Sequence, residues 1–134
     1  MRKLLTFAML GIFSSSAFAN DNIFSCNTED GKMVSVQKIG ANYVFSYGNV
    51  TFTNPITQVT NNENSYIATG SGFITSSLEL QNGHTTYTIE FVQPRNNPKE
   101  VDDPTLYITK GNDMKTIRCN NVYHNLDKKI MRTQ

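Results

Sequence analysis

Residues 73–92 read FITSSLELQNGHTTYTIEFV, two runs of alternating apolar and polar residues around Asn82-Gly83. Asn-Gly is the strongest short signal for a hairpin, because both central positions of a type I′ turn need positive φ. With Asn82-Gly83 as the two-residue loop, Leu78 faces Tyr87 across the strands. One face of the pair is then apolar and the other polar, as a half-buried antiparallel hairpin requires. This stretch therefore predicts an antiparallel hairpin.

The rest of the chain has the same short period-2 runs separated by turn residues, which is typical of an all-β domain. We expect a small antiparallel β-barrel or sandwich of about seven or eight strands. After Cys119, the apolar residues Val122, Leu126 and Ile130 recur at the spacing of one helix face, so residues 122–134 are expected to form a short helix or a tail. The candidate strands cover residues 23–26, 32–38, 43–47, 50–53, 65–69, 73–81, 84–92, 106–109 and 116–119.

Residues 1–19 have the three parts of a secretory signal peptide. Two basic residues precede an apolar run over residues 4–13, and Ala17-Phe18-Ala19 matches the small-residue cleavage pattern before Asn20. The apolar run is about half the roughly 20 residues that a spanning helix needs. We therefore expect a bacterial protein that is periplasmic or secreted, with no membrane span, and a single domain over residues 20–134.

The formal charge of the chain is close to balance. Loss of Arg2 and Lys3 with the leader would change the net charge from +1 to −1. Such a balance gives no electrostatic basis for binding nucleic acid or for adhesion to a membrane. The chain also lacks tryptophan, so we expect a modest core that benefits from a covalent cross-link.

The two cysteines, Cys26 and Cys119, lie near the two ends of the expected domain. An even number of cysteines in an exported chain predicts disulfides. Closing so long a loop would stabilise the fold by roughly 4 to 5 kcal/mol on the chain-entropy account. A redox or metal role is disfavoured, because there is no CxxC and no recognisable zinc spacing. Residues 22–25 do not form a lipid-attachment motif before Cys26, so no lipid anchor is expected.

No catalytic motif is recognisable in the sequence. His84 and His124 have no partner in sequence and are expected at the surface. In the predicted register, Glu79 and Glu90 share a polar face but lie roughly 13 Å apart, which is too far for a glycosidase pair. We therefore expect no catalytic residues, no metal and no cofactor. The hydroxyl residues between the two carboxylates form either a solvated face or a surface for a polar ligand, and they are Thr75, Ser77, Thr86 and Thr88.

Two loops are the candidate binding sites. The first contains Ser71, Gly72 and Phe73 in a small, flexible turn. The second lies within residues 93–104, which have three prolines and break the strand pattern; proline stiffening lowers the entropy lost on docking. The acidic end of this loop can be a solvated segment or a set of calcium ligands, although EF-hand spacing is absent. The candidate contacts in the second loop are Asn96, Asn97, Asp102 and Asp103.

The chain resembles the periplasmic inhibitors of C-type lysozymes in Phe24-Ser25-Cys26, the following Gly31, the alternating Val34 and Val36, and a closing Cys119 in the last strand. The resemblance implies a small exported β-barrel that acts through a Ser-Gly-x-x-Tyr loop inserted into the lysozyme cleft. Ser71-Gly72 matches the start of that loop, but Thr75 stands where the family has tyrosine. The tryptophan-containing segment that follows the loop in the family is also absent.

These observations favour an exported, non-catalytic binding module with a protein partner, an inhibitor of a cell-wall hydrolase such as lysozyme. The alternative is a structural or accessory envelope protein that docks on other exported proteins through an open strand edge. The sequence does not indicate the identity of the target or the oligomeric state.

Overall fold

The computed structural model describes residues 21–126 and 131–133, so the expected leader lies outside the described part of the chain. The predicted all-β class is confirmed: within these ranges nine strands pair antiparallel, and a short tenth pairs parallel to β5. The elements are β1 (Asp21–Thr28), β2 (Met33–Ile39), β3 (Asn42–Tyr47), β4 (Val50–Pro55), α2 (Ile56–Thr60), β5 (Tyr66–Thr69), β6 (Phe73–Asn82), β7 (Thr85–Pro94), β8 (Asp102–Lys110), β9 (Asp113–His124) and β10 (Arg132–Thr133).

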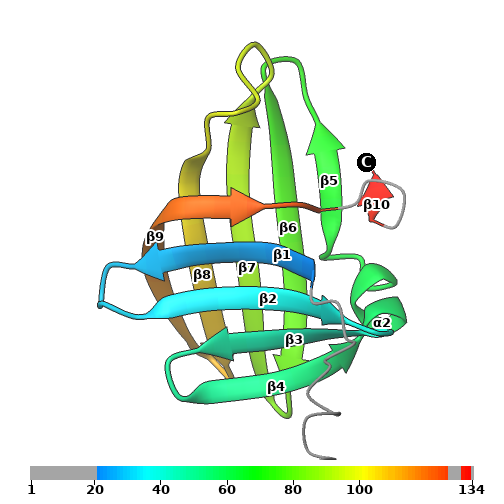
Figure 1. The fold of residues 1–134 in the computed structure, drawn as a ribbon, viewed down its shortest axis with the longest axis vertical. Helices are drawn as coiled ribbons and strands as arrows, with labels where there is room; N and C mark the ends of the chain where they lie inside the picture. The colour runs from blue at the N-terminus through cyan, green and yellow to red at the C-terminus, as the bar shows by residue number, and fades with distance from the viewer. Residues whose placement is uncertain (1–20, 127–130, 134) are drawn as a thin grey trace, which may run out of the picture.

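The strands form one curled sheet in the order β10-β5-β6-β7-β8-β9-β1-β2-β3-β4. Figure 1 shows β6–β8 running upright behind β1–β4, which cross them in front, with β5 upright beside β6, while β9 bends from the back layer to the front one. Layers that cross at a steep angle are typical of orthogonal packing, in which a strand that turns the corner joins the two sheets. The product is a half-barrel whose interior lies between the layers.

The hairpin predicted over residues 73–92 is present as β6 and β7, but the predicted register is wrong. Asn82 pairs with Thr85, so the loop is Gly83-His84. Of the residues in this turn, Gly83 alone has positive φ, at +65°, which is the pattern of a type II′ turn with glycine first. Such a turn leaves Asn82 in the strand and shifts the pairing by two positions. Because the shift is even, the apolar face stays the buried one.

Aromatic contacts between the two layers form the centre of the core. Phe24 of β1 stacks on Phe91 of β7 with ring centroids 5.7 Å apart. Phe45 of β3 lies 4.9 Å from Tyr87 of β7. All four side chains are buried, and full burial of a large apolar side chain stabilises by roughly 1.5 to 3 kcal/mol. These contacts therefore hold the front layer against the back one.

The two halves of the sheet meet along β1 and β9, where Phe24 pairs with His124 and Thr28 with Cys119. The predicted disulfide is present: Cys26 is bonded to Cys119, with Cα atoms 5.7 Å apart and a sequence separation of 93. We call this ladder with its disulfide the backbone seam.

The opposite margin of the half-barrel, between β4 and β6, is joined by side chains. The Asn54 Nδ2 donates to the Gln81 carbonyl at 2.9 Å, and its Oδ1 accepts from the Gln81 N–H at 2.8 Å. The amide thereby stands where a neighbouring backbone would stand in a ladder. Next to it, the Ser65 Oγ accepts from the Glu79 N–H at 2.9 Å. We call these contacts the side-chain seam. They provide hydrogen-bond partners for the main-chain groups of β6 that follow Ser77, where the pairing of β6 with β5 ends.

The long connection predicted over residues 93–104 is shorter in the structure. Strand β7 continues to Pro94 and β8 begins at Asp102, which leaves residues 95–101, hereafter loop 95–101. The prolines do not break the strands, because Pro94 ends β7 and Pro104 lies where the β7–β8 register shifts between Glu90 and Val92. Strand ends and bulges tolerate a residue that cannot donate to the ladder.

The expectation for the C-terminal segment changes as well. Val122 lies in β9, which runs to His124, so the helical alternative is wrong for these residues. The spacing of Val122 and Leu126 resembled a helix face, but pairing with β1 extends the chain instead. Ile130 lies outside the described residues. A short helix that the sequence did not indicate, α2, follows Pro55.

Candidate functional site

One end of the molecule brings together the turn between β5 and β6 and loop 95–101, both at the top of Figure 1. Phe73 and Pro94 are the last paired residues of β6 and β7 at this end. Beyond them the Arg95 N–H donates to the Gly72 carbonyl at 3.0 Å. The two segments that the sequence offered as separate contact loops are therefore neighbours in space.

A hollow of about 390 Å³ lies between the two segments. Four of the seven residues predicted to bind a partner line it, together with two neighbours that the sequence reasoning missed. We call this feature the apical hollow, and its lining residues are Ser71, Gly72, Phe73, Pro94, Arg95 and Asn96.

The lining of the apical hollow combines an exposed aromatic ring with a few polar groups. Phe73 is 52% exposed. The Arg95 Nη1 donates to the Gly70 carbonyl at 3.1 Å, which steadies the guanidinium beside the turn. Aromatic and arginine side chains supply much of the binding energy at protein interfaces. The lining thus combines an exposed aromatic ring, an arginine and small polar residues around one hollow.

The other three predicted contact residues lie apart from the apical hollow. Asn97 is exposed in loop 95–101, where its Nδ2 donates to a Glu100 carboxylate oxygen at 3.3 Å. Asp102 starts β8 opposite Val92. Asp103, which has φ +50°, has a carboxylate 3.6 Å from the Arg118 Nη1 at the surface. The two aspartates are therefore engaged in the sheet and at its surface, away from the hollow.

Loop 95–101 is fastened to the sheet by Gln93 of β7, which is almost fully buried. The Gln93 Nε2 donates to the Pro98 carbonyl at 2.6 Å and lies 3.3 Å from the His124 Nε2. The His124 ring also packs on the Phe91 ring, with centroids 4.7 Å apart. Burial lowers the pKa of His124 below its ordinary value. His124 is thus a half-buried member of the core margin, and the expected surface position is wrong for it.

The corrected hairpin register also changes the relation between Glu79 and Glu90. Glu79 pairs with Thr88, and Glu90 with Ser77, so the two carboxylates are diagonal neighbours. Diagonal positions lie roughly 7–8 Å apart, and the separation inferred from the sequence is wrong. The Asn62 Nδ2 donates to the Glu79 Oε1 at 2.8 Å. Neither carboxylate lines either of the two hollows described in the structure.

The hydroxyl strip predicted on this face is only partly open to solvent. Ser77 is buried, and its Oγ donates to the Asn64 carbonyl at 2.9 Å. The Thr86 Oγ1 accepts from the Gln81 Nε2 at 3.0 Å. These hydroxyls take part in holding β6 and its neighbours. Ser77 is the buried member of the strip, and Thr75, Thr86 and Thr88 are partly exposed.

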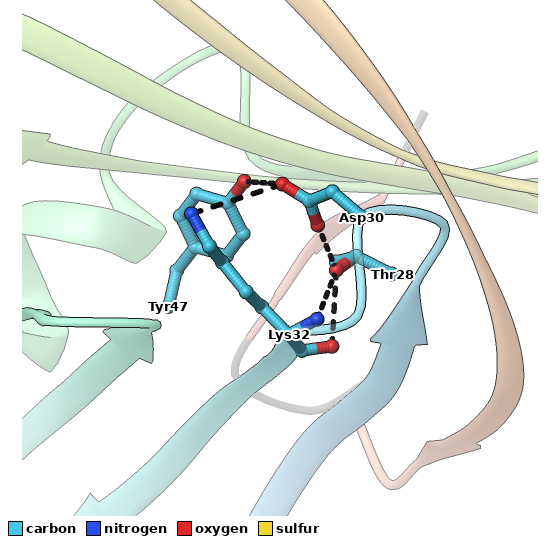
Figure 2. A network of polar contacts seen from close by, with 4 residues as sticks. All are labelled: Thr28, Asp30, Lys32 and Tyr47. Atoms are coloured by element: carbon cyan, nitrogen blue, oxygen red, sulfur yellow. Dashed lines mark hydrogen bonds and ion pairs between the residues drawn. The ribbon is translucent and has the colours of Figure 1, made fainter.

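The turn between β1 and β2 holds a network of polar contacts, shown in Figure 2. The Thr28 Oγ1 donates to one Asp30 carboxylate oxygen and accepts from the Lys32 N–H at 2.9 Å. The Tyr47 hydroxyl donates to the other Asp30 oxygen at 2.7 Å. The Lys32 Nζ lies 3.9 Å from that oxygen and 5.1 Å from the centre of the Tyr47 ring. All four side chains satisfy one another, so the network fixes the turn.

The network shifts the titration of two of its members. The hydrogen bond from Thr28, then that from Tyr47, lowers the pKa of Asp30. Burial, then the hydrogen bond to Asp30, raises the pKa of Tyr47 to about 12. Both shifts favour an ionised aspartate and a neutral tyrosine at neutral pH.

A second hollow, of about 330 Å³, lies beside the disulfide on the other side of loop 95–101. Within residues 21–126 and 131–133, no group of three or more histidine, cysteine or acidic residues is arranged to hold a metal ion. The acidic end of β8 accordingly has no such cluster around Asp102 and Asp103. The second hollow is lined by Lys99, Val101, Pro104, Cys119, Asn120, Asn121 and Val122.

Sequence reasoning missed Arg95, Gln93 and Asn54, the residues that shape the apical hollow, fasten loop 95–101 and close the half-barrel. Polar residues in or next to a strand carry no sequence signal for such contacts, because their partners lie on segments that only the fold brings near. Comparisons with protein families, with curated proteins and with solved structures found no match. In the described part of the chain, no helix has the length and apolar character needed to cross a bilayer.

Proposed function

We propose that this protein is an exported, non-catalytic binding module that inhibits a cell-wall hydrolase of the lysozyme type. The observation that carries the proposal is the meeting of two separately predicted contact loops around the apical hollow, sealed by the Arg95 N–H bond to Gly72. The disulfide fits an oxidising compartment outside the cytoplasm. A bacterial periplasmic or secreted location, reached through the leader of residues 1–19, belongs to the same proposal.

The shape of the contact end supports an inhibitor. The ladder between β6 and β7 continues through Phe73 and Pro94, so the turn of Ser71 and Gly72 is presented on a rigid hairpin. A preorganised loop loses little entropy on entering a partner's cleft. The exposed ring of Phe73 supplies apolar area, and the neighbouring polar groups supply directional contacts.

The experiment measures lysis of bacterial cell walls by several C-type lysozymes with the purified protein in molar excess. We expect lysis to fall for at least one lysozyme. Phe73→Ala should weaken inhibition by roughly 30-fold, the loss typical of a central aromatic contact. Tyr123→Ala is the matched control, because Tyr123 is 49% exposed but lies on β9, away from the hollow.

Unchanged lysis with every lysozyme would overturn the inhibitor function. Equal weakening by Phe73→Ala and Tyr123→Ala would instead overturn the assignment of the apical hollow as the contact surface.

A second function, docking on another exported protein through a strand edge, is favoured by the position of β4. It is the terminal strand in the sheet order. The Ile56 N–H donates to the Ala41 carbonyl at 2.9 Å, so by alternation the N–H groups of Thr51 and Thr53 point away from β3. Such an edge can accept a strand from a partner. Thr53→Pro removes an outward N–H without touching the β3 ladder, and loss of a partner detected by native mass spectrometry would support this function.

A further inference from the structure

We infer that His124 and Gln93 form a proton-operated latch that fastens loop 95–101 when His124 is neutral and releases it when His124 is protonated. The regulatory consequence for binding rests on the proposed function, because this loop forms one wall of the apical hollow. The release of the loop is a property of the free protein and can be measured without a partner.

The first step is the orientation of the Gln93 amide. Its Nε2 lies 2.6 Å from the Pro98 carbonyl oxygen. A carbonyl oxygen can only accept, so the amide must present its NH₂ group to Pro98. The loop therefore fixes which way the amide points.

The second step is the protonation state of His124. The same Gln93 Nε2 lies 3.3 Å from the His124 Nε2. With one hydrogen of the NH₂ group directed at Pro98, the other is available to the imidazole, which must accept it on an unprotonated Nε2. The latched loop thus requires neutral His124. Burial of the ring against Phe91 favours the same neutral form.

The third step follows from adding a proton at the His124 Nε2. Two donors would then face each other, and the Gln93 amide relieves the conflict by turning over so that its Oε1 accepts from the imidazolium. The Oε1 then also faces the Pro98 carbonyl, and two acceptors repel each other. The amide has two orientations, and only one of them holds the loop, which makes it the two-state element of the latch.

The side chains described in contact with His124 are uncharged. Strand β1 supplies its partner Phe24, and β7 supplies Phe91 and Gln93. Among the hydrogen bonds and ion pairs described for residues 21–126, none joins His124 to a charged residue of the loop. The charged residues of loop 95–101 are Arg95, Lys99 and Glu100. The first charged residues after His124 in the sequence are Asp127, Lys128 and Lys129, which lie outside the described residues.

Hydrogen exchange of the free protein between pH 7.5 and pH 5 tests the latch. The reporters are the N–H groups of Asn97 and Glu100, which donate to the Pro94 and Asn97 carbonyls at 3.1 and 3.0 Å. We expect their protection factors to fall by about five- to tenfold, the effect of losing one typical hydrogen bond. The amides of β6 and β7 should keep their protection. The fall should follow the titration of His124 measured by NMR, with a midpoint below 6.5, the ordinary value for histidine.

Variants separate the latch from general effects of acid. His124→Phe retains a ring against Phe91 and cannot titrate, so its loop should stay protected at pH 5. Gln93→Leu removes the bond to Pro98, so its loop should be unprotected at both pH values. His84→Phe is the matched control, because His84 is exposed in the β6–β7 turn, and it should behave as the wild type.

Equal loss of protection in His124→Phe and the wild type would overturn the latch. So would a His124 titration that leaves the loop amides unchanged, a result that the wild-type protein supplies even if a variant does not fold. Lysozyme inhibition that fails at every pH, with the loop still released by acid, would overturn the proposed function and leave the latch standing.

Discussion

The half-barrel is joined along two margins, and the two joints are built differently. The backbone seam joins β1 to β9 by a ladder of main-chain hydrogen bonds and by the Cys26–Cys119 disulfide. At the side-chain seam, Asn54 joins β4 to β6, and Ser65, which directly precedes β5, bonds to the next stretch of β6. No strand-to-strand ladder is described between β4 and β6. The backbone seam has several main-chain hydrogen bonds and a covalent bond, whereas the side-chain seam depends on the side chains of Asn54 and Ser65.

The difference shows that the two margins of one curled sheet can be joined by contacts with different structural requirements. A ladder needs matched strand lengths and register along its whole course. A buried amide needs only one well-placed residue, because it can donate and accept as a peptide group does. The side-chain seam therefore needs few residues but is sensitive to a single substitution, whereas the main-chain hydrogen bonds of the backbone seam do not depend on any one side chain.

The largest expected effect comes from removing the covalent part of the backbone seam. The double variant Cys26→Ser with Cys119→Ser should lower the free energy of unfolding by about 2 to 5 kcal/mol. Urea unfolding followed by circular dichroism measures the change. The wild type under reducing conditions is the control and should show a similar loss. A change below about 1 kcal/mol would mean that the ladder alone carries this seam.

Breaking the side-chain seam should have the next largest effect. Asn54 is buried, and Asn54→Ala leaves the N–H and carbonyl of Gln81 without their amide partner, which should cost about 2 to 4 kcal/mol. Asn61→Ala is a matched control, since Asn61 is exposed at the end of α2. Similar unfolding midpoints for the two variants would show that the amide does not hold β4 to β6.

Ser65→Ala should lower the free energy of unfolding by about 1 to 2 kcal/mol, less than Asn54→Ala, because only the Glu79 N–H loses its acceptor. Ser65 is fully buried, so water does not readily replace the hydroxyl. Combined with Asn54→Ala, the losses should not be simply additive, because both residues act on one stretch of β6. Unfolding curves of the two single variants and the double variant measure this coupling.

Acid should weaken the turn between β1 and β2 but leave the contribution of the side-chain seam unchanged. Asp30 lies in the turn that ends β1, and its pKa is lowered by its hydrogen bonds to Thr28 and Tyr47. Its stabilising contribution is therefore complete above the ordinary value of 3.8 and is lost as the pH falls through the lowered folded value. The stability difference between the wild type and Asp30→Asn should shrink across that range. The difference caused by Asn54→Ala should stay constant, since neither Asn54 nor Gln81 titrates.

Alkali tests the same turn from the other side. Burial and the bond to Asp30 raise the pKa of Tyr47 to about 12, above its ordinary 10.0. The neutral tyrosine therefore stabilises the fold fully below pH 10, and this contribution disappears as the pH rises through about 12. Unfolding measured between pH 8 and pH 12 should show a loss in the wild type that is smaller in Tyr47→Phe. Equal losses in the two proteins would contradict a role for the Tyr47 hydroxyl.

Much of the fold could be predicted because it follows from local patterns. Alternation located most strands, and two cysteines behind a predicted export leader indicated the disulfide. The Asn82-Gly83 pair gave the hairpin but not its register, because Gly83 alone can supply the positive φ of a type II′ turn. That two-residue shift preserved the buried face, yet it changed which side chains are neighbours and brought Glu79 and Glu90 together.

The candidate site was also predictable only in part, because local patterns locate residues but do not fix their neighbours. Ser71, Gly72, Phe73 and Asn96 were found as loop residues with unusual composition. Asp102 and Asp103 belong to β8, because a bulge accommodates the proline that had suggested a loop.

The sequence by itself determined the all-β class, the disulfide and the two exposed loops, because each depends on a residue's own conformational or chemical preference. Only the tertiary structure decided that the loops meet at one hollow, that Asn54 closes the half-barrel and that His124 lies against Gln93. Those contacts join segments far apart in the chain. Their partners are chosen by the curl of the sheet and the register of its strands, which no local pattern records.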